Sequence, residues 1–159
     1  MAKSKKRTLG AGTVASNRYA SYRYELLERL QCGMVLLGTE VKSLRATGAQ
    51  LKDSYATFRE GELWLHGVYI APYAPAANDN HEPERERKLL ARRRELDDIA
   101  ARVAERGLTL VPTRIYFAGP HAKVEIALAR GKDLYDKRQS IRERESKRDM
   151  QRALREARR

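Results

Sequence analysis

A short apolar run between two glycines, followed at once by a helix start, is the feature that most constrains the fold of this chain. Residues 34–37 are Met-Val-Leu-Leu and are bounded by glycines, which is typical of a buried strand. Thr39 then predicts a helix cap, and Glu40 falls in the first turn, where a negative charge is favourable. The chain is therefore expected to pass directly from a core strand into a short helix at residues 39–45.

The predicted helix has two chemically different sides. Val41 and Leu44 are three residues apart and can both face inward on one helical turn, whereas Lys42 and Arg45 share the other side. Such a turn is either an ordinary corner with solvated charges or a cationic surface braced against a barrel. The local pattern alone favours the ordinary corner.

Positive charge is distributed unevenly along the 159 residues. The formal net charge is +12, of which residues 1–18 contribute +5 and residues 130–159 contribute +6, so the segment between them is nearly neutral. Two cationic arms on a balanced domain are typical of proteins that bind a polyanion, most often nucleic acid. Solvated tails that aid solubility are the alternative.

Length and cysteine content favour one cytoplasmic domain. The chain is long enough to bury a real core, and Cys32 is its only cysteine, so no intramolecular disulfide can form. The basic N-terminus precedes no apolar stretch of the secretory kind, and no run reaches the roughly 18–20 apolar residues of a membrane span. We therefore expect a cytoplasmic location and no membrane partner.

The strand signals predict a mainly β fold built from hairpins. Residues 13–17 predict a short edge strand, and residues 22–37 predict a long strand with a bend or bulge at Gly33. Residues 55–70 and residues 109–129 each predict a hairpin. This order indicates a small closed antiparallel barrel with appended helices, of either the OB or the SH3-like type.

The clearest predicted helix spans residues 84–106. Gly107 ends it, and a proline-rich loop at residues 71–83 precedes it. One side of this helix is cationic, and the other carries an apolar stripe that comprises Leu89, Leu96, Ile99, Ala100 and Val103.

Both chain ends are predicted to lack order of their own, which leaves residues 12–130 as the domain. Residues 1–11 are rich in Lys, Gly and Ser and have no periodicity, so we expect a disordered basic arm. Residues 131–159 are rich in good helix formers, but their few apolar residues form no continuous stripe. We expect this basic tail to be disordered in the free protein and helical on a partner.

Asn17 precedes an aromatic and basic cluster of Arg18, Tyr19 and Tyr22. Aromatic rings and cations together can stack on RNA bases and neutralise phosphates. The tyrosines can equally cover the edge of the core. The residues leave the two interpretations balanced.

The sequence contains no recognisable catalytic motif. His66, His81 and His121 lack metal-ligand spacing, and one cysteine cannot supply a zinc motif. The chain has no phosphate-binding glycine-rich loop and no Gly-x-Ser-x-Gly. We therefore expect a protein that is not an enzyme and uses no cofactor and no metal.

Several short motifs occur in a characteristic order from about residue 13 to the C-terminus. They are Gly38-Thr-Glu-Val-Lys-Ser-Leu-Arg45, Asp53-Ser-Tyr55, Gly61-Glu62, Arg87-Lys-Leu-Leu90, Gly107, Val111-Pro112, Gly131-Lys132 and Tyr135-Asp-Lys-Arg138. Their order and approximate spacing resemble the small protein B family, the bacterial SsrA-binding proteins that accompany transfer-messenger RNA. Several motifs in order are far more specific than any one of them.

The resemblance implies an OB-type barrel that binds structured RNA without catalysis. The RNA would be the tRNA-like domain of transfer-messenger RNA, and the role would be rescue of stalled ribosomes in trans-translation. The tail would enter the decoding region and the empty messenger path of the small ribosomal subunit. A general RNA-binding OB module or a structural ribosomal protein is the alternative.

The resemblance also implies two sets of binding residues. The RNA-facing set would be Asn17, Glu40, Lys42, Ser43, Arg45, Arg87, Lys88 and Leu90. The ribosome-binding set in the tail would be Arg130, Gly131, Lys132, Tyr135, Asp136, Lys137 and Arg138.

The chain departs from the family pattern at four positions. Gln31 stands where an RNA-contacting Glu is typical, and Ala91 replaces the third Leu of a triplet. Asp133 lies where a second Lys is usual, and Tyr135 occupies an aromatic position that is His in some members. A direct acidic contact at residue 31 and a protonatable ring at residue 135 are therefore not expected here.

Overall fold

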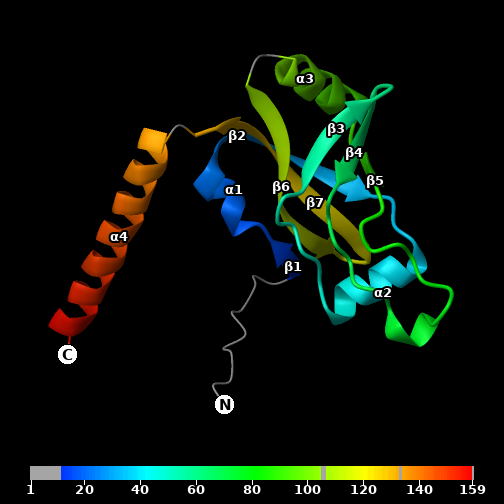
Figure 1. Ribbon diagram of the computed structural model, residues 1–159, viewed down its shortest axis with the longest axis horizontal. Helices are drawn as coiled ribbons and strands as arrows, with labels where there is room; N and C mark the ends of the chain where they lie inside the picture. Colours follow the sequence, from blue (N-terminus) through cyan, green and yellow to red (C-terminus); the bar gives the residue numbers. More distant parts are fainter. Residues whose placement is uncertain (1–11, 105–106, 133, 159) are drawn as a thin grey trace.

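The chain folds into one antiparallel sheet with helices around it (Figure 1). The computed structural model describes residues 12–104, 107–132 and 134–158, so the predicted arm at residues 1–11 lies outside the described residues. The elements in chain order are β1 (Thr13–Ser16), α1 (Arg18–Arg23), β2 (Tyr24–Met34), α2 (Gly38–Ala46), β3 (Tyr55–Arg59), β4 (Glu62–His66), η1 (Ala74–Ala76), β5 (Arg87–Leu90), α3 (Arg93–Val103), β6 (Leu108–Ala118), β7 (His121–Gly131) and α4 (Leu134–Ala157).

The strand pairings join seven strands into one sheet. The strand order is β1-β6-β3-β4-β5-β2-β7, and β6 also pairs with β7. β6 accommodates several partners because they meet it at different places: β1 pairs near Tyr116, whereas β3 pairs at Leu110. The prediction of a mainly antiparallel β fold with appended helices is confirmed.

The core is formed by the inward-facing residues of the strands and is closed by two helices. Leu63 and Leu65 of β4 are completely buried, as is Val124 of β7. Helix α2 contributes Leu44, and α3 contributes Ile99 to the same cluster. The core therefore fixes how α2 sits against the strands, which matters for the site described below.

The predicted helix at residues 84–106 is wrong over its first part. The segment Arg87–Leu90 is strand β5, which pairs with β2 and β4, and α3 begins only at Arg93. Side chains alternate along β5, so that Arg87 and Leu89 are buried while Leu90 is exposed. Because one of the two buried positions is an arginine, this alternation does not register as a hydrophobic pattern.

Two other local features differ from the sequence-based expectations. Strand β2 continues through Gly33 without a break, and its register shifts between Leu26 and Glu28 instead. Helix α1 was not predicted. It begins after Asn17, whose side-chain oxygen accepts a hydrogen bond from the backbone N–H of Ala20 at 3.3 Å, in the manner of an N-cap.

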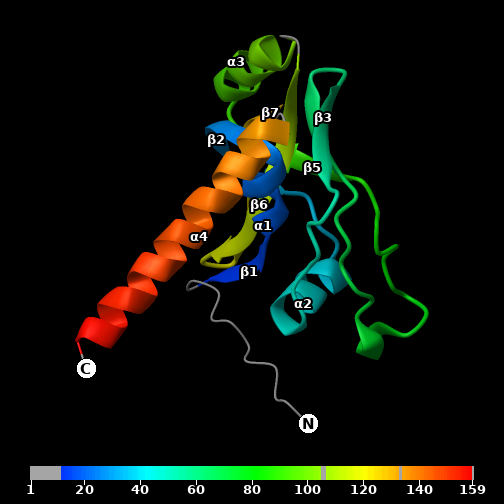
Figure 2. The ribbon, with the colours of Figure 1, turned by 60° about the vertical axis from the view of Figure 1, so that its left-hand side comes forward.

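The tail contains α4, a helix of 24 residues, and the expectation that it lacks order in the free protein stays a prediction. The start of α4 is tied to α1: Nζ of Lys132 donates to the carbonyl of Ser21 at 2.9 Å and lies 3.0 Å from the hydroxyl of Ser140. Further along, Met150 and Leu154 are each 61% exposed. Figures 1 and 2 show this part of the helix extending away from the strands.

Candidate nucleic-acid interface

Helix α2 begins one residue earlier than the sequence predicted. Its N-cap is Leu37, whose backbone N–H donates to Oε2 of Glu40 at 2.8 Å. This contact satisfies a backbone donor near the helix start. Thr39 is not the cap, because its hydroxyl instead lies 2.9 Å from Nδ1 of His81.

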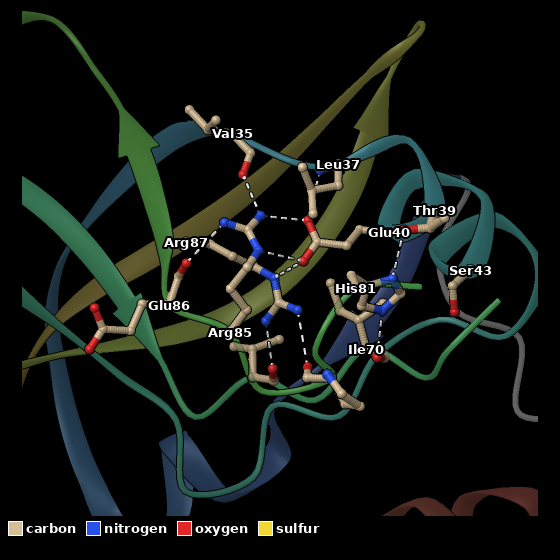
Figure 3. A network of polar contacts seen from close by, with 12 residues as sticks. Val35, Leu37, Thr39, Glu40, Ser43, Ile70, His81, Arg85, Glu86 and Arg87 are labelled. Carbon is tan, nitrogen blue, oxygen red and sulfur yellow. Dashed lines mark hydrogen bonds and ion pairs between the residues drawn. The ribbon is translucent and has the colours of Figure 1, made fainter. Parts of the chain in front are cut away.

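Glu40 is the centre of a buried charged network (Figure 3). Its Oε1 accepts from Nε of Arg87 at 2.9 Å, and its Oε2 accepts from Nη2 of Arg85 at 2.7 Å. The side chains of Glu40 and Arg87 are fully buried, and that of Arg85 is 31% exposed. Arg87 also donates to the carbonyls of Val68 at 2.7 Å and Pro83 at 3.0 Å. The network thus joins α2, β5 and the segment between β4 and β5.

Burial and ion pairing shift the pKa values of Glu40 and Arg87 in opposite directions. Burial alone raises the pKa of Glu40, but hydrogen bonds from Arg85 and the Leu37 N–H and the charge of Arg87 outweigh it, so the pKa lies below its usual range. Burial lowers the pKa of Arg87, and Glu40 opposes that shift. Glu40 is therefore ionised at neutral pH, and Arg87 supplies the opposite charge because a guanidinium stays protonated in proteins.

Two further contacts hold α2 against the segment that follows β4. The hydroxyl of Ser43 donates to the carbonyl of Ala71. Nε2 of the buried His81 lies 2.9 Å from the carbonyl of Ile70, so in the neutral imidazole this nitrogen donates and Nδ1 accepts from Thr39. Contacts at Thr39 and at Ser43 therefore help to fix the orientation of α2.

The solvent side of α2 presents cations that rest on aromatic rings. Nζ of Lys42 lies 5.6 Å from the ring centroid of Tyr73, and the guanidinium carbon of Arg45 lies 4.2 Å from that of Phe117. A cation over a ring face is restrained while its charge remains open to a second partner. This arrangement suits phosphate groups, which need fixed cations more than a deep pocket.

Strand β5 continues this surface. Nζ of Lys88 lies 2.6 Å from Oε1 of Glu62, and both side chains are partly exposed. Leu90 is 51% exposed and lines a cavity of about 290 Å³ together with His121 and Lys123. An apolar side chain and a cation therefore share one concavity beside α2.

The structure divides the predicted RNA-facing residues into two groups. Lys42, Arg45, Lys88 and Leu90 reach solvent. Glu40, Ser43 and Arg87 are buried, so their side chains do not reach solvent here, and a direct contact of these three with RNA stays a prediction. Their hydrogen-bonding groups are directed into the protein, where they position the exposed residues.

Asn17 is half-buried and belongs to neither the exposed group nor the buried group. Its amide nitrogen donates to the carbonyls of Pro112 at 3.0 Å and Leu51 at 3.3 Å, and its oxygen caps α1. The side chain therefore links α1, the loop before β3 and β6. Its effect on any ligand is through the position of these elements.

A second polar cluster, which the sequence did not indicate, lies on the outer face of β2, β6 and β7. The buried Glu125 accepts from Arg29 at 2.9 Å, Gln31 at 3.0 Å and Thr113 at 2.7 Å. Burial alone raises the pKa of Glu125, but the hydrogen bonds and the charge of Arg114 lower it overall. Gln31 thus contacts an acid of its own chain. The partners are distant in sequence, so no local pattern could reveal them.

The predicted tail residues lie where β7 ends and α4 begins. Arg130 and Gly131 are the last residues of β7, and the backbone N–H of Lys132 donates to the carbonyl of Arg23 at 3.1 Å. Arg138 is exposed on α4. The side chains of Tyr135, Asp136 and Lys137 lie outside the described residues, as does Asp133.

The part of the chain that the structure describes has no cluster of three or more His, Cys, Asp and Glu side chains suited to a metal ion. His66 lies 2.7 Å from the Thr57 hydroxyl and 3.2 Å from Glu86, a sequence of contacts that resembles a hydrolase relay. However, Glu86 also pairs with Arg59, and the ring of Tyr55 stacks on the imidazole. We interpret this group as cross-strand packing.

No helix within residues 12–104, 107–132 and 134–158 has the length and apolar character needed to cross a membrane.

Three comparisons relate the chain to known proteins. The family model described as SmpB protein matches residues 14–156. An SsrA-binding protein of Thermobifida fusca is 51% identical over 99% of this chain and 100% of its own length, and one of Oleidesulfovibrio alaskensis is 47% identical over 95% of this chain and 97% of its own length. A chain in a solved structure described as "tmRNA-SmpB: a journey to the center of the bacterial ribosome" is similar with a TM-score of 0.65 and 47% identity, over 77% of this chain and 86% of that chain.

Proposed function

The chain belongs to the SmpB family, and from this premise we infer that it binds the tRNA-like domain of transfer-messenger RNA and brings it to stalled ribosomes for trans-translation. The observation that carries this inference is the identity of about half of all positions to SsrA-binding proteins over nearly the whole chain. Members of one family at this level of identity share their fold and their binding surface. The partners of the protein are then transfer-messenger RNA and the ribosome, and its place is the cytoplasm.

The exposed residues of α2 and β5 are the proposed RNA contacts. Lys42 and Arg45 supply charges for phosphates, Lys88 extends the cationic row, and Leu90 supplies an apolar contact in the neighbouring concavity. The buried pair of Glu40 and Arg87 keeps α2 at a fixed angle, so the cations are already in place when RNA arrives. Binding of this kind needs no catalytic group, and the proposed function is not enzymatic.

We further propose that the strands form an OB-type barrel. The ring of pairings from β6 through β3, β4, β5, β2 and β7 back to β6 supports closure. Such a barrel gives a rigid body on which α2 and β5 share one side.

The tail is the proposed ribosome contact. Residues 130–159 carry a net charge of +6, and the exposed part of α4 has few neighbours in its own chain. A cationic helix of this kind fits a channel lined by RNA phosphates. The decoding region and messenger path of a stalled small subunit offer such a channel, where the tail set from Arg130 to Arg138 would bind.

A gel-shift titration tests the RNA-binding proposal. The tRNA-like domain should bind with an affinity that falls steeply with salt, because phosphate contacts release counterions. An elongator tRNA at the same salt is the matched control and should bind more weakly. Equal affinity for both RNAs would favour a general RNA-binding module, and the family-specific function would be rejected.

A truncation tests the division of labour between domain and tail. A chain ending at Lys132 keeps all of β7, so it should stay folded and bind the tRNA-like domain as the full chain does. It should fail in a reconstituted peptide-tagging assay, because the messenger path stays empty. The triple change Asp136→Ala, Lys137→Ala, Arg138→Ala should give the same result. Full tagging by the truncated chain would contradict the proposed role of the tail.

A further inference from the structure

A second concave site lies on a different part of the molecule, between α1, the start of β3 and β6. It encloses about 250 Å³, and its walls include Tyr19, Tyr24 and Tyr55 together with Arg23, Asp53 and Thr109. It shares no lining residue with the concavity that contains Leu90. Typical ligand pockets hold about 300–1,000 Å³, so this one suits a single ring system.

The walls of this pocket are held by contacts inside the protein. The amide of Asn17 joins the carbonyls of Leu51 and Pro112, and Ser54 also bonds to the carbonyl of Leu51. The ring of Tyr55 stacks on His66 with centroids 5.0 Å apart and planes 19° apart, so the imidazole supports it from one side. Tyr55 is nonetheless 46% exposed, which leaves ring surface for a ligand. The pocket is therefore preformed.

The polar groups at the mouth point to the chemistry of the ligand. Nη1 of Arg23 lies 3.3 Å from Oδ1 of Asp53, and the two side chains are 49% and 65% exposed. The guanidinium holds the carboxylate at the pocket, where it can accept hydrogen bonds only. Among the bases, guanine presents two adjacent N–H donors on its Watson–Crick edge, which a carboxylate can accept as a pair.

The rim is cationic. Helix α1 carries Arg18 and Arg23 and no acidic residue. Nζ of Lys52 lies 5.6 Å from the ring centroid of Tyr19, so a further cation stands beside an aromatic wall. Aromatic walls inside and cations at the edge are the combination with which proteins bind an unpaired nucleotide, by stacking its base and neutralising its phosphate.

We propose that this pocket binds one unpaired nucleotide, with the base against Tyr55, guanine preferred through Asp53, and the phosphate at Arg23 and Lys52. The proposal rests on the proposed function in one respect, since the natural nucleotide would belong to the bound RNA. Free nucleotides offer the same chemistry, and the experiment separates the two sources. Asn17 then supports RNA binding by building this pocket.

The first arm titrates the full chain with GMP, AMP, CMP and UMP, followed by tyrosine fluorescence. We expect saturable binding that is tightest for GMP. Tyr55→Ala should weaken it about tenfold through lost stacking, and Tyr55→Phe, which keeps the ring, should restore it. Asp53→Asn should remove the preference for GMP over AMP. Asp53 has φ of 60°, a conformation that Asn tolerates, so this variant keeps the backbone.

The second arm measures the affinity of the same variants for the tRNA-like domain and their melting temperatures. A loss with Tyr55→Ala at unchanged melting temperature supports a nucleotide within the RNA, and binding of GMP without such a loss supports a free nucleotide. If no mononucleotide binds and Tyr55→Ala leaves RNA affinity unchanged, the pocket proposal is overturned. Wild-type protein that binds GMP but not the tRNA-like domain would reject the proposed function and keep the pocket.

Discussion

The two sides of the junction between α2 and β5 use neighbouring residues for opposite purposes. On the inner side, Glu40 and Arg87 are fully buried and pair at 2.9 Å. On the outer side, Lys42 and Lys88, each no more than two residues away in sequence, reach solvent. Charged residues in one short motif are thus either paired inside the fold or exposed and available to a partner. Whether a charged residue is buried or exposed depends on the side of the element on which it lies, and not on its residue type.

The physical difference between the sides is the environment of the charge. A buried ion pair has lost its water, so removing one member leaves the other without compensation. An exposed cation keeps its water and contributes little to stability, but it can release counterions when it meets phosphate. Substitutions of the inner residues should therefore change the stability of the fold, and substitutions of the outer residues should change the affinity for RNA.

The largest expected effect is on the inner side. Glu40→Ala leaves two arginines without their carboxylate and removes the partner of the Leu37 N–H, so the free energy of unfolding should fall by about 3–5 kcal/mol. Urea unfolding measures it. The matched control is Glu62→Ala, which breaks the partly exposed pair with Lys88 and should change stability by about 0–1 kcal/mol. Similar losses in both variants would contradict the division between the two sides.

A smaller effect should appear when pH is lowered. The folded-state pKa values of Glu40 and Glu125 lie below their ordinary value of 4.5, so ionisation stabilises the fold above that pH. This stability should be lost as pH falls below 4.5 and the carboxylates take up protons. Glu40→Gln should flatten the decline in unfolding free energy between neutral pH and pH 3, since one titrating group is gone. A decline parallel to that of the wild type would show that Glu40 is not one of the groups responsible.

The smallest effect on stability is expected on the outer side. Lys42→Ala should leave the melting temperature nearly unchanged, because the side chain is exposed. It should weaken binding of the tRNA-like domain and reduce the salt slope by about 1, the value for one lost phosphate contact. Arg94→Ala removes an exposed cation from α3 and serves as the control. An equal loss of affinity in both variants would indicate that net charge, and not this surface, determines binding.

Much of the architecture could be predicted because it depends on local patterns. The two hairpins follow from alternation and turn residues, and Glu60 and Gly61 both have the positive φ that a tight two-residue turn requires. The α2 turn followed from its apolar spacing. Only its exact start differed, because Leu37 takes the cap position.

Two of the failures have a common physical cause, which is pairing between residues that are far apart in sequence. Arg87 appeared to belong to a cationic helix face because its partner Glu40 is 47 residues away. Glu125 is held by Arg29 and Gln31, which are 96 and 94 residues away. A buried charge is visible only once its partner is in place. The resemblance to a family predicted a set of RNA-facing residues, but it did not separate exposed members such as Lys42 from buried members such as Glu40.

Arg87 and Lys88 allow the most direct test, because they are adjacent cations that face opposite sides of β5. Each is replaced by Met, and both variants are compared in urea unfolding and in binding of the tRNA-like domain. We predict that Arg87→Met lowers the free energy of unfolding by about 3 kcal/mol or more, since Glu40 loses its buried partner. Lys88→Met should stay within about 1 kcal/mol of the wild type and bind the RNA more weakly. Equal losses of stability, or a fully stable Arg87→Met variant that binds RNA poorly, would contradict the account.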